Sequence, residues 1–284
     1  MAKHFASKPA AKKSSAQGLN EHRARKRFGQ NFLEDDGIIR RIIKCISPKA
    51  EDNLVEIGPG KGAITQHLLE ACPTLQVVEL DRDLIPVLLS QFIARYPDFS
   101  IHQQDALKFD FSSLLGEPAN PLRIVGNLPY NISTPLIFHL LSYHGQVRDM
   151  HFMLQKEVVD RMAAQPEEKA YGRLGIMVQY YCRVENLFDV PPESFNPRPK
   201  VDSAIVRLTP YEQLPVVAKD VKTLEKLVNT AFQQRRKTLR NSLKQLMPAA
   251  AIEALDVDTG VRPENISLAE YVRLSDALFE LEQG

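Results

Sequence analysis

The chain has 284 residues, 44% of them hydrophobic and 25% charged, and these ordinary globular proportions argue against global disorder and against a membrane protein. The formal net charge is only +1, but residues 1–30 carry eight Lys/Arg and a single acidic residue. The three cysteines, at positions 45, 72 and 182, form no Cys-x-x-Cys pair, so we expect reduced thiols in a cytoplasmic protein that has no metal site.

The N-terminal segment is basic and has no periodic apolar face. We expect residues 1–24 to be an extension that is disordered in isolation, and order to begin near Arg25. Asp35 and Asp36 are good helix N-cap residues. Isoleucines follow them at helical spacing as far as Ile46, which predicts a helix there.

Strand-like and helix-like patterns then alternate along the chain. Short apolar runs, separated from one another by helical stretches, occupy residues 54–57, 75–80, 99–103, 122–125 and 151–154. This alternation predicts an α/β fold with a parallel sheet covered by helices on both faces. The ligand of such a sheet is expected beyond the carboxyl ends of its strands.

The pattern changes after residue 154. A helix is expected at 155–164, followed by two long apolar and aromatic runs at 174–187 and 201–208 that could pair as an antiparallel hairpin at one sheet edge. Prolines mark a boundary near residue 210, and the chain beyond it shows only helical periodicity. We therefore predict a sheet domain at 25–210 and a small all-helical domain at 211–284.

The stretch Leu54–Gly62 predicts a strand, a tight turn and the start of a helix, and its glycines indicate a nucleotide-type cofactor. Glycine reaches positive φ at low cost, and its backbone lets a ligand lie directly on it. Gly58, Gly60 and Ala63 satisfy the G-x-G-x-x-G/A dinucleotide pattern, so the spacing leaves NAD and FAD open. A structural turn without a ligand is the other alternative.

Polar residues lie at the expected ends of the same strands. Glu56 ends the first strand, and Glu79 ends the second, where a carboxylate can accept hydrogen bonds from ribose hydroxyls. Asp105 follows the third strand, where it could accept from the exocyclic amine of an adenine, and Asn127-Leu128-Pro129-Tyr130 follows the fourth. Each alone could be a helix cap or an ordinary turn. Their occurrence at consecutive strand ends favours one binding site.

These motifs resemble those of S-adenosylmethionine-dependent adenine-N6 methyltransferases. Three further segments, at residues 26–33, 195–203 and 231–239, are similar to the kasugamycin-sensitivity family of small-subunit ribosomal RNA adenine dimethyltransferases. The resemblance extends from about residue 25 to the C-terminus. It implies a Rossmann-like methyltransferase sheet and transfer of methyl groups to the N6 of two adjacent 16S rRNA adenosines, giving N6,N6-dimethyladenosine.

The resemblance also implies which residues hold the cofactor, S-adenosylmethionine, and it makes NAD a poor fit. Asn31 and Leu33 would close over it, and Gly58 and Gly60 would back its methionine portion. Glu79 would hold the ribose and Asp105 would recognise the adenine, with Asn127 also at the cofactor.

The Asn127–Tyr130 turn is the predicted catalytic element. An adenine exocyclic nitrogen is planar and poorly nucleophilic, because its lone pair is delocalised into the ring. The Asn127 side-chain oxygen and the Leu128 carbonyl would accept its two hydrogens and favour a pyramidal nitrogen, with Pro129 fixing the turn. Tyr130 and, by the resemblance, Phe195 would stack on the two faces of the extruded base. A core aromatic is the alternative for Phe195.

Two basic clusters are predicted to bind the RNA backbone, because phosphate contacts come from clustered Lys and Arg. They are Arg25, Lys26 and Arg27 near the N-terminus, and Arg235, Arg236, Lys237 and Arg240 on a helical pattern of the small domain. A solvated tail and a solvated helix face are the alternatives.

The expected partner is an assembly intermediate of the small ribosomal subunit, bound by a monomeric enzyme with neither DNA nor a membrane as partner. Two alternatives remain. One is a large-subunit rRNA adenine methyltransferase of the antibiotic-resistance kind, and the other is an RNA-binding ribosome assembly factor for which methylation is secondary.

Overall fold

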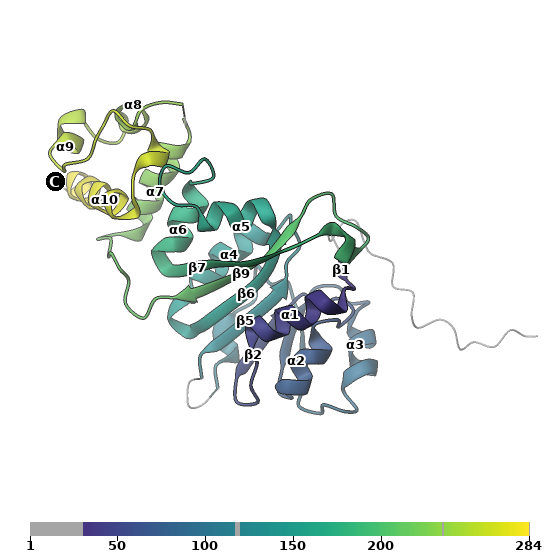
Figure 1. The fold of residues 1–284 in the computed structure, drawn as a ribbon. Helices are drawn as coiled ribbons and strands as arrows, with labels where there is room; N and C mark the ends of the chain where they lie inside the picture. The colour runs from purple at the N-terminus through teal and green to yellow at the C-terminus, as the bar shows by residue number, and fades with distance from the viewer. Residues whose placement is uncertain (1–30, 117–119, 235, 284) are drawn as a thin grey trace, which may run out of the picture.

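The computed structural model describes residues 31–116, 120–234 and 236–283. The predicted N-terminal extension, residues 1–24, lies outside these ranges, and so do Arg25, Lys26, Arg27 and Arg235. The described chain consists of a central sheet, helices on both of its faces, and a group of C-terminal helices at one end of the molecule (Figure 1).

The main sheet has seven strands in the order β4-β3-β2-β5-β6-β9-β7. In chain order these strands are β2 (Asn53–Ile57), β3 (Gln76–Glu79), β4 (Ser100–Gln103), β5 (Leu122–Asn127), β6 (Val147–Gln155), β7 (Cys182–Val190) and β9 (Ser203–Pro210). The strands from β4 to β6 pair in parallel, whereas β9 pairs antiparallel with both β6 and β7. The predicted parallel sheet and the antiparallel pair at its edge are both confirmed.

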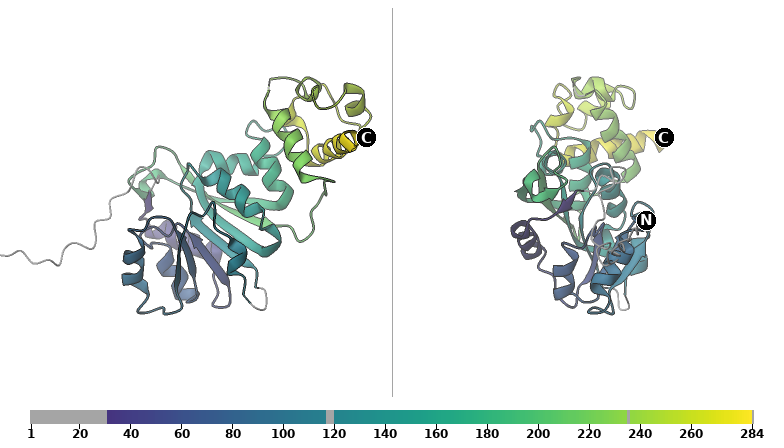
Figure 2. Two further views of the ribbon diagram at one scale, coloured as in Figure 1. Left: turned by 180° about the vertical axis from the view of Figure 1, so that it is seen from behind. Right: turned by 90° about the vertical axis from the view of Figure 1, so that its right-hand side faces the viewer.

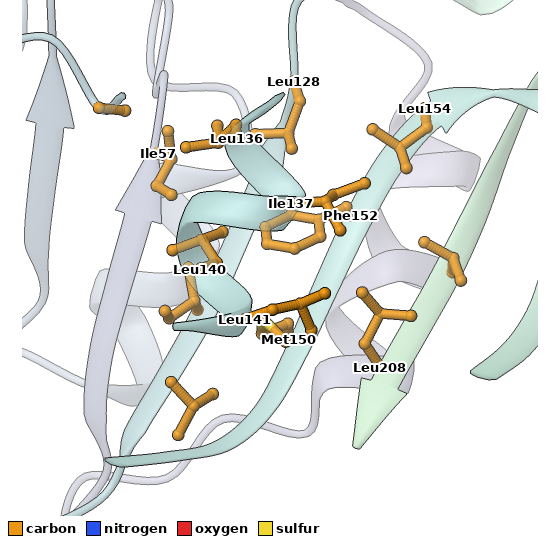
Figure 3. Packing of buried hydrophobic residues seen from close by; sticks show 14 of the residues in the cluster. Ile57, Leu128, Leu136, Ile137, Leu140, Leu141, Met150, Phe152, Leu154 and Leu208 are labelled. Carbon is orange, nitrogen blue, oxygen red and sulfur yellow. The ribbon is translucent and has the colours of Figure 1, made fainter. Parts of the chain in front are cut away.

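Helices cover both faces of this sheet, as Figure 2 shows. One face carries α1 (Asp36–Ile46), α2 (Thr65–Ala71) and α3 (Ile85–Phe92), and the other carries α4 (Ser133–Leu141) and α5 (Lys156–Ala163). Neighbouring residues of a strand point to opposite faces, so Ile124 belongs to one core cluster and Val125 to the other. Figure 3 shows Leu136 and Leu140 of α4 in the first cluster, which also includes Phe152 of β6.

Helix α1 begins where the sequence predicts. Its N-cap is Asp35, whose Oδ1 accepts hydrogen bonds from the backbone nitrogens of Gly37 (2.8 Å) and Ile38 (3.0 Å). Two of the four backbone N–H groups that a helix start leaves free are therefore paired. The isoleucine spacing puts Ile39, Ile42 and Ile46 in the core, so the buried face of α1 is fixed by the pattern.

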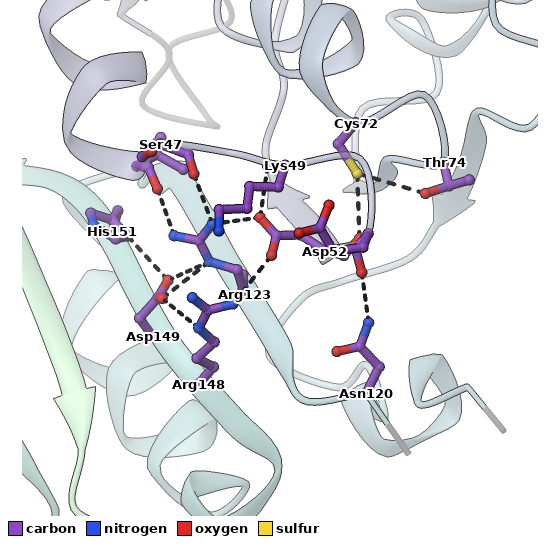
Figure 4. A network of polar contacts seen from close by, with 12 residues as sticks. Ser47, Lys49, Asp52, Cys72, Thr74, Asn120, Arg123, Arg148, Asp149 and His151 are labelled. Atoms are coloured by element: carbon purple, nitrogen blue, oxygen red, sulfur yellow. Dashed lines mark hydrogen bonds and ion pairs between the residues drawn. The ribbon is translucent and has the colours of Figure 1, made fainter. Parts of the chain in front are cut away.

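A buried polar network holds the other end of α1 against the sheet (Figure 4). Arg123, which is 5% exposed, contacts Asp52 through Nη1 (2.6 Å) and Asp149 through Nε (3.1 Å). Its Nη2 also donates to the Ile46 carbonyl at 2.6 Å, which pairs an otherwise free carbonyl of the last helical turn. Burial acts to raise the pKa of Asp149, but contacts with His151 and Arg123 outweigh it and hold that pKa below its ordinary value.

The apolar run predicted at 174–187 is not a single strand. Residues Arg173–Tyr181 form helix α6, and β7 starts only at Cys182. Val178 packs in the sheet's core, whereas Ile176 and Tyr180 pack in a third cluster with the C-terminal helices. A helix buried on two sides has no polar face, so its sequence cannot be told from a buried strand by periodicity.

The C-terminal segment is helical, as predicted. It contains α7 (Val221–Phe232), α8 (Leu239–Leu243), α9 (Ala249–Glu253) and α10 (Leu268–Gln283), and its core cluster also includes residues of α6. Short 3-10 turns complete the described chain at Phe111–Leu114, His144–Gln146, Pro192–Ser194 and Pro263–Asn265. Among the residues described, no helix combines the length and the apolar character that a membrane span requires.

Candidate functional site

A cavity of about 960 Å³ opens at the carboxyl ends of β2, β3 and β5. Its walls bring together all the predicted cofactor residues and the whole predicted catalytic turn: Asn31, Leu33, Gly58, Gly60, Glu79, Asp105, Asn127, Leu128, Pro129 and Tyr130. These residues are spread over a hundred positions of sequence, and they meet because parallel strands carry their carboxyl ends to one edge of the sheet.

The glycine turn leaves its backbone open to the cavity. Gly58 and Gly60 both have positive φ, +67° and +60°, a backbone conformation that residues with a Cβ rarely adopt. A Cβ on Gly60 would also lie 3.2 Å from Cδ1 of Phe32, another cavity residue. The amide nitrogen of Gly58 donates to the carbonyl of Val78 at 2.9 Å, which fixes the turn to the end of β3.

Two buried glutamates face the cavity from adjacent strands. Glu56 is 2% exposed, and Thr65 Oγ1 donates a 2.6 Å hydrogen bond to its Oε2. Burial raises the pKa of Glu56 to about 8, with the charge of Glu79 adding to the rise and the bond from Thr65 opposing it. Burial also raises the pKa of Glu79, whose Oε1 accepts from the backbone nitrogen of Asp81 at 2.7 Å. Backbone hydrogen bonds from Asp81, Gly60 and Leu80 act against this rise and hold the carboxyl group in place.

Asp105 is half-buried at the cavity wall after β4. Its Oδ1 accepts a 3.0 Å hydrogen bond from the backbone nitrogen of Leu107. The carboxylate therefore caps its own turn, as the alternative interpretation of the sequence expected, and still faces the cavity. The two functions are compatible because a carboxylate has two acceptor oxygens.

The Asn127–Tyr130 turn is held by contacts on both sides. The side-chain Nδ2 of Asn127 donates to the Asn31 carbonyl at 3.1 Å, which leaves the amide oxygen as an acceptor for another partner. The backbone nitrogen of Leu128 donates to the carbonyl of Met153 on β6 at 3.2 Å. The hydroxyl of Tyr130 shares a 2.7 Å hydrogen bond with Ser203 Oγ.

A small second sheet, absent from the sequence predictions, contributes Phe32 and Leu33 to the cavity wall. Strand β1 (Phe32–Leu33) pairs antiparallel with β8 (Phe195–Asn196), so Leu33 lies opposite Phe195. Lys61 of the glycine turn lies over the Phe32 ring, with its Nζ 4.7 Å from the ring centroid. Phe195 is 4% exposed in the core cluster of α1 and does not line the cavity.

The predicted basic helix face is not helical as a whole. Arg236 and Lys237 are exposed in the turn between α7 and α8, and Arg240, on α8, forms an ion pair with Glu253. The chain from 233 to 238 has no apolar residue that could give a helix a buried face, so α7 ends at Phe232. The two described basic residues of the turn point into solvent, where they can meet a polyanion.

Besides the sheet of β1 and β8, sequence reasoning missed three further features of this site. Gly126 allows β2 and β5 to approach closely, since a Cβ there would lie 2.7 Å from the carbonyl oxygen of Ile57. The remaining two are the bond from Thr65 to Glu56 and the bond between Tyr130 and Ser203. A glycine inside an apolar strand is a signal that could have revealed the first, whereas long-range side-chain pairs leave none.

Comparisons with known proteins identify the relatives of this chain. The sequence model of the ribosomal RNA adenine dimethylase family matches residues 21–280. The ribosomal RNA small subunit methyltransferase A of Saccharophagus degradans is 67% identical, over 94% of this chain and 99% of its own length. The protein of the same name from Pseudomonas putida is 62% identical, over 93% of this chain and 98% of its own.

Solved structures agree with the fold. A dimethyladenosine transferase from Plasmodium falciparum superposes with a TM-score of 0.75 at 28% identity, covering 89% of this chain and 98% of that one. The 23S rRNA methyltransferase ErmE gives a TM-score of 0.68 at 24% identity, covering 88% of this chain and 100% of that one.

Proposed function

The chain belongs to the ribosomal RNA adenine dimethylase family. On that premise we propose that the protein transfers methyl groups, within this cavity, to the N6 of two adjacent adenosines in 16S rRNA. The protein is an S-adenosylmethionine-dependent rRNA adenine dimethyltransferase of the small-subunit type. The observation that carries the assignment of the site is the single cavity that gathers the glycine turn, Glu79, Asp105 and the Asn127–Tyr130 turn.

The residues that line the cavity suit the groups of S-adenosylmethionine. Gly58 and Gly60 carry no side chain where the methionine portion would lie, and the Glu79 carboxylate lines the cavity where it would accept hydrogen bonds from the ribose hydroxyls. Asp105 would accept from the adenine amine, and Asn31 and Leu33 would close the site as part of the β1 segment. When bound, the cofactor supplies an electrophilic methyl group on its sulfonium.

Asn127 and Leu128 would prepare the nucleophile. The bond from Asn127 Nδ2 to the Asn31 carbonyl orients the amide, so its Oδ1 can accept one hydrogen of the target amine. The Leu128 carbonyl would accept the other, and Pro129 fixes the turn that makes both acceptors converge. Holding both hydrogens favours a pyramidal nitrogen with its lone pair available, which is catalysis by orientation rather than by a strong base.

Tyr130 would stack on the extruded base, and Phe195 would stack on its other face. Each such stack is worth about 1–3 kcal/mol. Because Phe195 is buried against the core, its ring has to turn out of the α1 cluster to reach the base. The pairing of β8 with β1 therefore links the second stacking residue to the strand that covers the cofactor.

The basic residues would position the RNA. Arg236 and Lys237, exposed in the turn after α7, and Arg240 on α8 would contact backbone phosphates, as would Arg25, Lys26, Arg27 and Arg235. Such contacts orient RNA without reading its sequence. We assign the target choice to the shape of the small-subunit assembly intermediate, recognised by a cytoplasmic monomer with a catalytic domain at 25–210 and a helical domain at 211–284.

The decisive experiment supplies labelled S-adenosylmethionine with unmethylated small subunits, large subunits or naked DNA, followed by digestion to nucleosides. We expect N6,N6-dimethyladenosine in the small subunit alone. Label confined to the large subunit would assign the protein to the resistance-type activity. Tight small-subunit binding without label would support the assembly-factor alternative.

A further inference from the structure

The Tyr130–Ser203 contact joins the catalytic turn to a distant strand. Their hydroxyl oxygens are 2.7 Å apart, although the residues are separated by 73 positions of sequence. Tyr130 lines the cavity and is only partly buried, whereas Ser203 has no exposed surface and does not line the cavity. The serine therefore meets the tyrosine from behind the cavity wall.

The backbone around Ser203 is rigid. Ser203 is the first residue of β9, the strand between β6 and β7, and it lies opposite Gln155 on one side and Val190 on the other. The Asp202 carbonyl next to it accepts from the backbone nitrogen of Lys156 at 2.9 Å. The strand pairing therefore holds the Ser203 hydroxyl in one position relative to the sheet.

The base of the tyrosine is fixed as well. The Ile132 nitrogen donates to the Pro129 carbonyl at 3.1 Å, and Ser133 Oγ donates to the Tyr130 carbonyl at 3.1 Å. A tyrosine ring has two side-chain torsions, so anchoring its backbone alone leaves the ring free to turn. Anchoring the hydroxyl at its far end removes that freedom.

We propose that Ser203 is a positioning residue for methyl transfer, which holds the plane of the Tyr130 ring in the orientation required to stack on the target adenine. The proposal rests on the function proposed above for Tyr130. Ser203 acts through that ring, since it bonds to Tyr130 and does not itself line the cavity.

A structural role is the competing explanation, because the Ser203 hydroxyl is buried and needs a partner. The two explanations differ in what the loss of the bond does. Ser203→Ala removes the buried hydroxyl together with its bond to Tyr130, a residue that is only partly buried. The variant should therefore keep the fold intact while the Tyr130 ring gains freedom. A net hydrogen bond corresponds to about threefold to tenfold in an equilibrium, which sets the expected loss in turnover.

The test is a double-mutant cycle in the full-length protein, using Ser203→Ala, Tyr130→Phe and the double variant. Initial rates are measured on unmethylated small subunits, with melting temperature and S-adenosylmethionine affinity measured alongside. Ser275→Ala is the matched control: Ser275 is also fully buried, and within the described chain its hydroxyl has no hydrogen-bond partner. Ser203→Thr keeps the hydroxyl and suits a strand.

Positioning predicts that Ser203→Ala and Tyr130→Phe lower kcat by the same factor, about threefold to tenfold, at unchanged KM for subunits and unchanged cofactor affinity. The double variant should be no slower than either single one, Ser203→Thr should restore the rate, and Ser275→Ala should not change it. The proposal would be overturned if kcat in the double variant fell by the product of the two single factors, or if Ser203→Ala kept the wild-type kcat.

A measurement independent of activity separates this proposal from the proposed function. In protein labelled at tyrosine ring carbons, the Tyr130 signal is identified by its absence from Tyr130→Phe. It should shift or broaden in Ser203→Ala and stay unchanged in Ser275→Ala. An unchanged signal in Ser203→Ala refutes positioning, whereas a wild-type protein that methylates no small subunits refutes the function and leaves this result standing.

Discussion

The buried carboxyl group of Glu56 should make the stability of the protein depend on pH in a predictable direction. Burial raises the pKa of Glu56 from an ordinary 4.5 to about 8 in the folded chain. Between these two values the unfolded chain has lost a proton that the folded chain keeps. Raising the pH through this window therefore favours unfolding, by about 1.4 kcal/mol for each pH unit.

The Glu56→Gln substitution isolates this contribution. Glutamine keeps an oxygen that can accept from Thr65 but carries no charge at any pH, so the cost that the wild type bears at pH 7 disappears. From pH 4.5 to 7 that cost accumulates to about 3 kcal/mol. We expect the variant to be about 1 kcal/mol more stable than the wild type at pH 5 and about 3 kcal/mol more stable at pH 7.

Urea unfolding followed by far-ultraviolet circular dichroism at pH 5, 6, 7 and 8 would measure the effect, because the chain contains no tryptophan to report by fluorescence. Glu225→Gln, at an exposed position of α7, is the control for removing a charge. If the Glu56→Gln and wild-type curves run parallel from pH 5 to 8, Glu56 is not held neutral in the fold and the reasoning is wrong.

Three other variants test the site and the fold. Asn127→Ala should reduce methyl transfer about 100-fold or more in single-turnover assays while changing S-adenosylmethionine affinity little, and near-normal turnover would contradict the role of its amide. Replacing Arg236 and Lys237 by glutamate should weaken binding to small subunits and flatten its salt dependence in filter-binding assays, whereas an unchanged salt slope would mean that this turn is only solvated. Arg123→Met should lower the free energy of unfolding by about 3–5 kcal/mol in urea titrations, because it removes the buried cation that two buried carboxylates share; a loss below about 1 kcal/mol would mean that the network of Figure 4 relaxes or takes up protons at little cost.

The parts of the site that follow from sequence are those governed by strand topology. Gly58, Glu79, Asp105 and Asn127 lie at the carboxyl ends of four parallel strands, so recognising the strands was enough to predict that these residues meet. The start of α1 was predictable for a similar reason, since Asp35 caps it and the isoleucine spacing defines its buried face.

The parts that could not be predicted depend on contacts between distant segments. Strands β1 and β8 are two residues long and are paired across more than 160 positions, so neither has a periodic pattern. Helix α6 is buried against both the sheet and the C-terminal helices, which removed the polar face that identifies a helix. The Ser203 hydroxyl lies beside Tyr130 only because β9 is inserted between β6 and β7.

The charge of the cavity supports S-adenosylmethionine over a dinucleotide where the glycine spacing alone does not. A carboxylate at Glu79 is compatible with both, since dinucleotide sites also use one for the ribose. Glu56 is the residue that distinguishes the two kinds of cofactor. It is buried beside the glycine turn, where the pyrophosphate of a dinucleotide would bring two negative charges. In the proposed complex, the sulfonium and ammonium groups of S-adenosylmethionine would instead bring positive charge toward the glycine turn, and the buried carboxyl group of Glu56, whose pKa is raised by burial, could ionise in response.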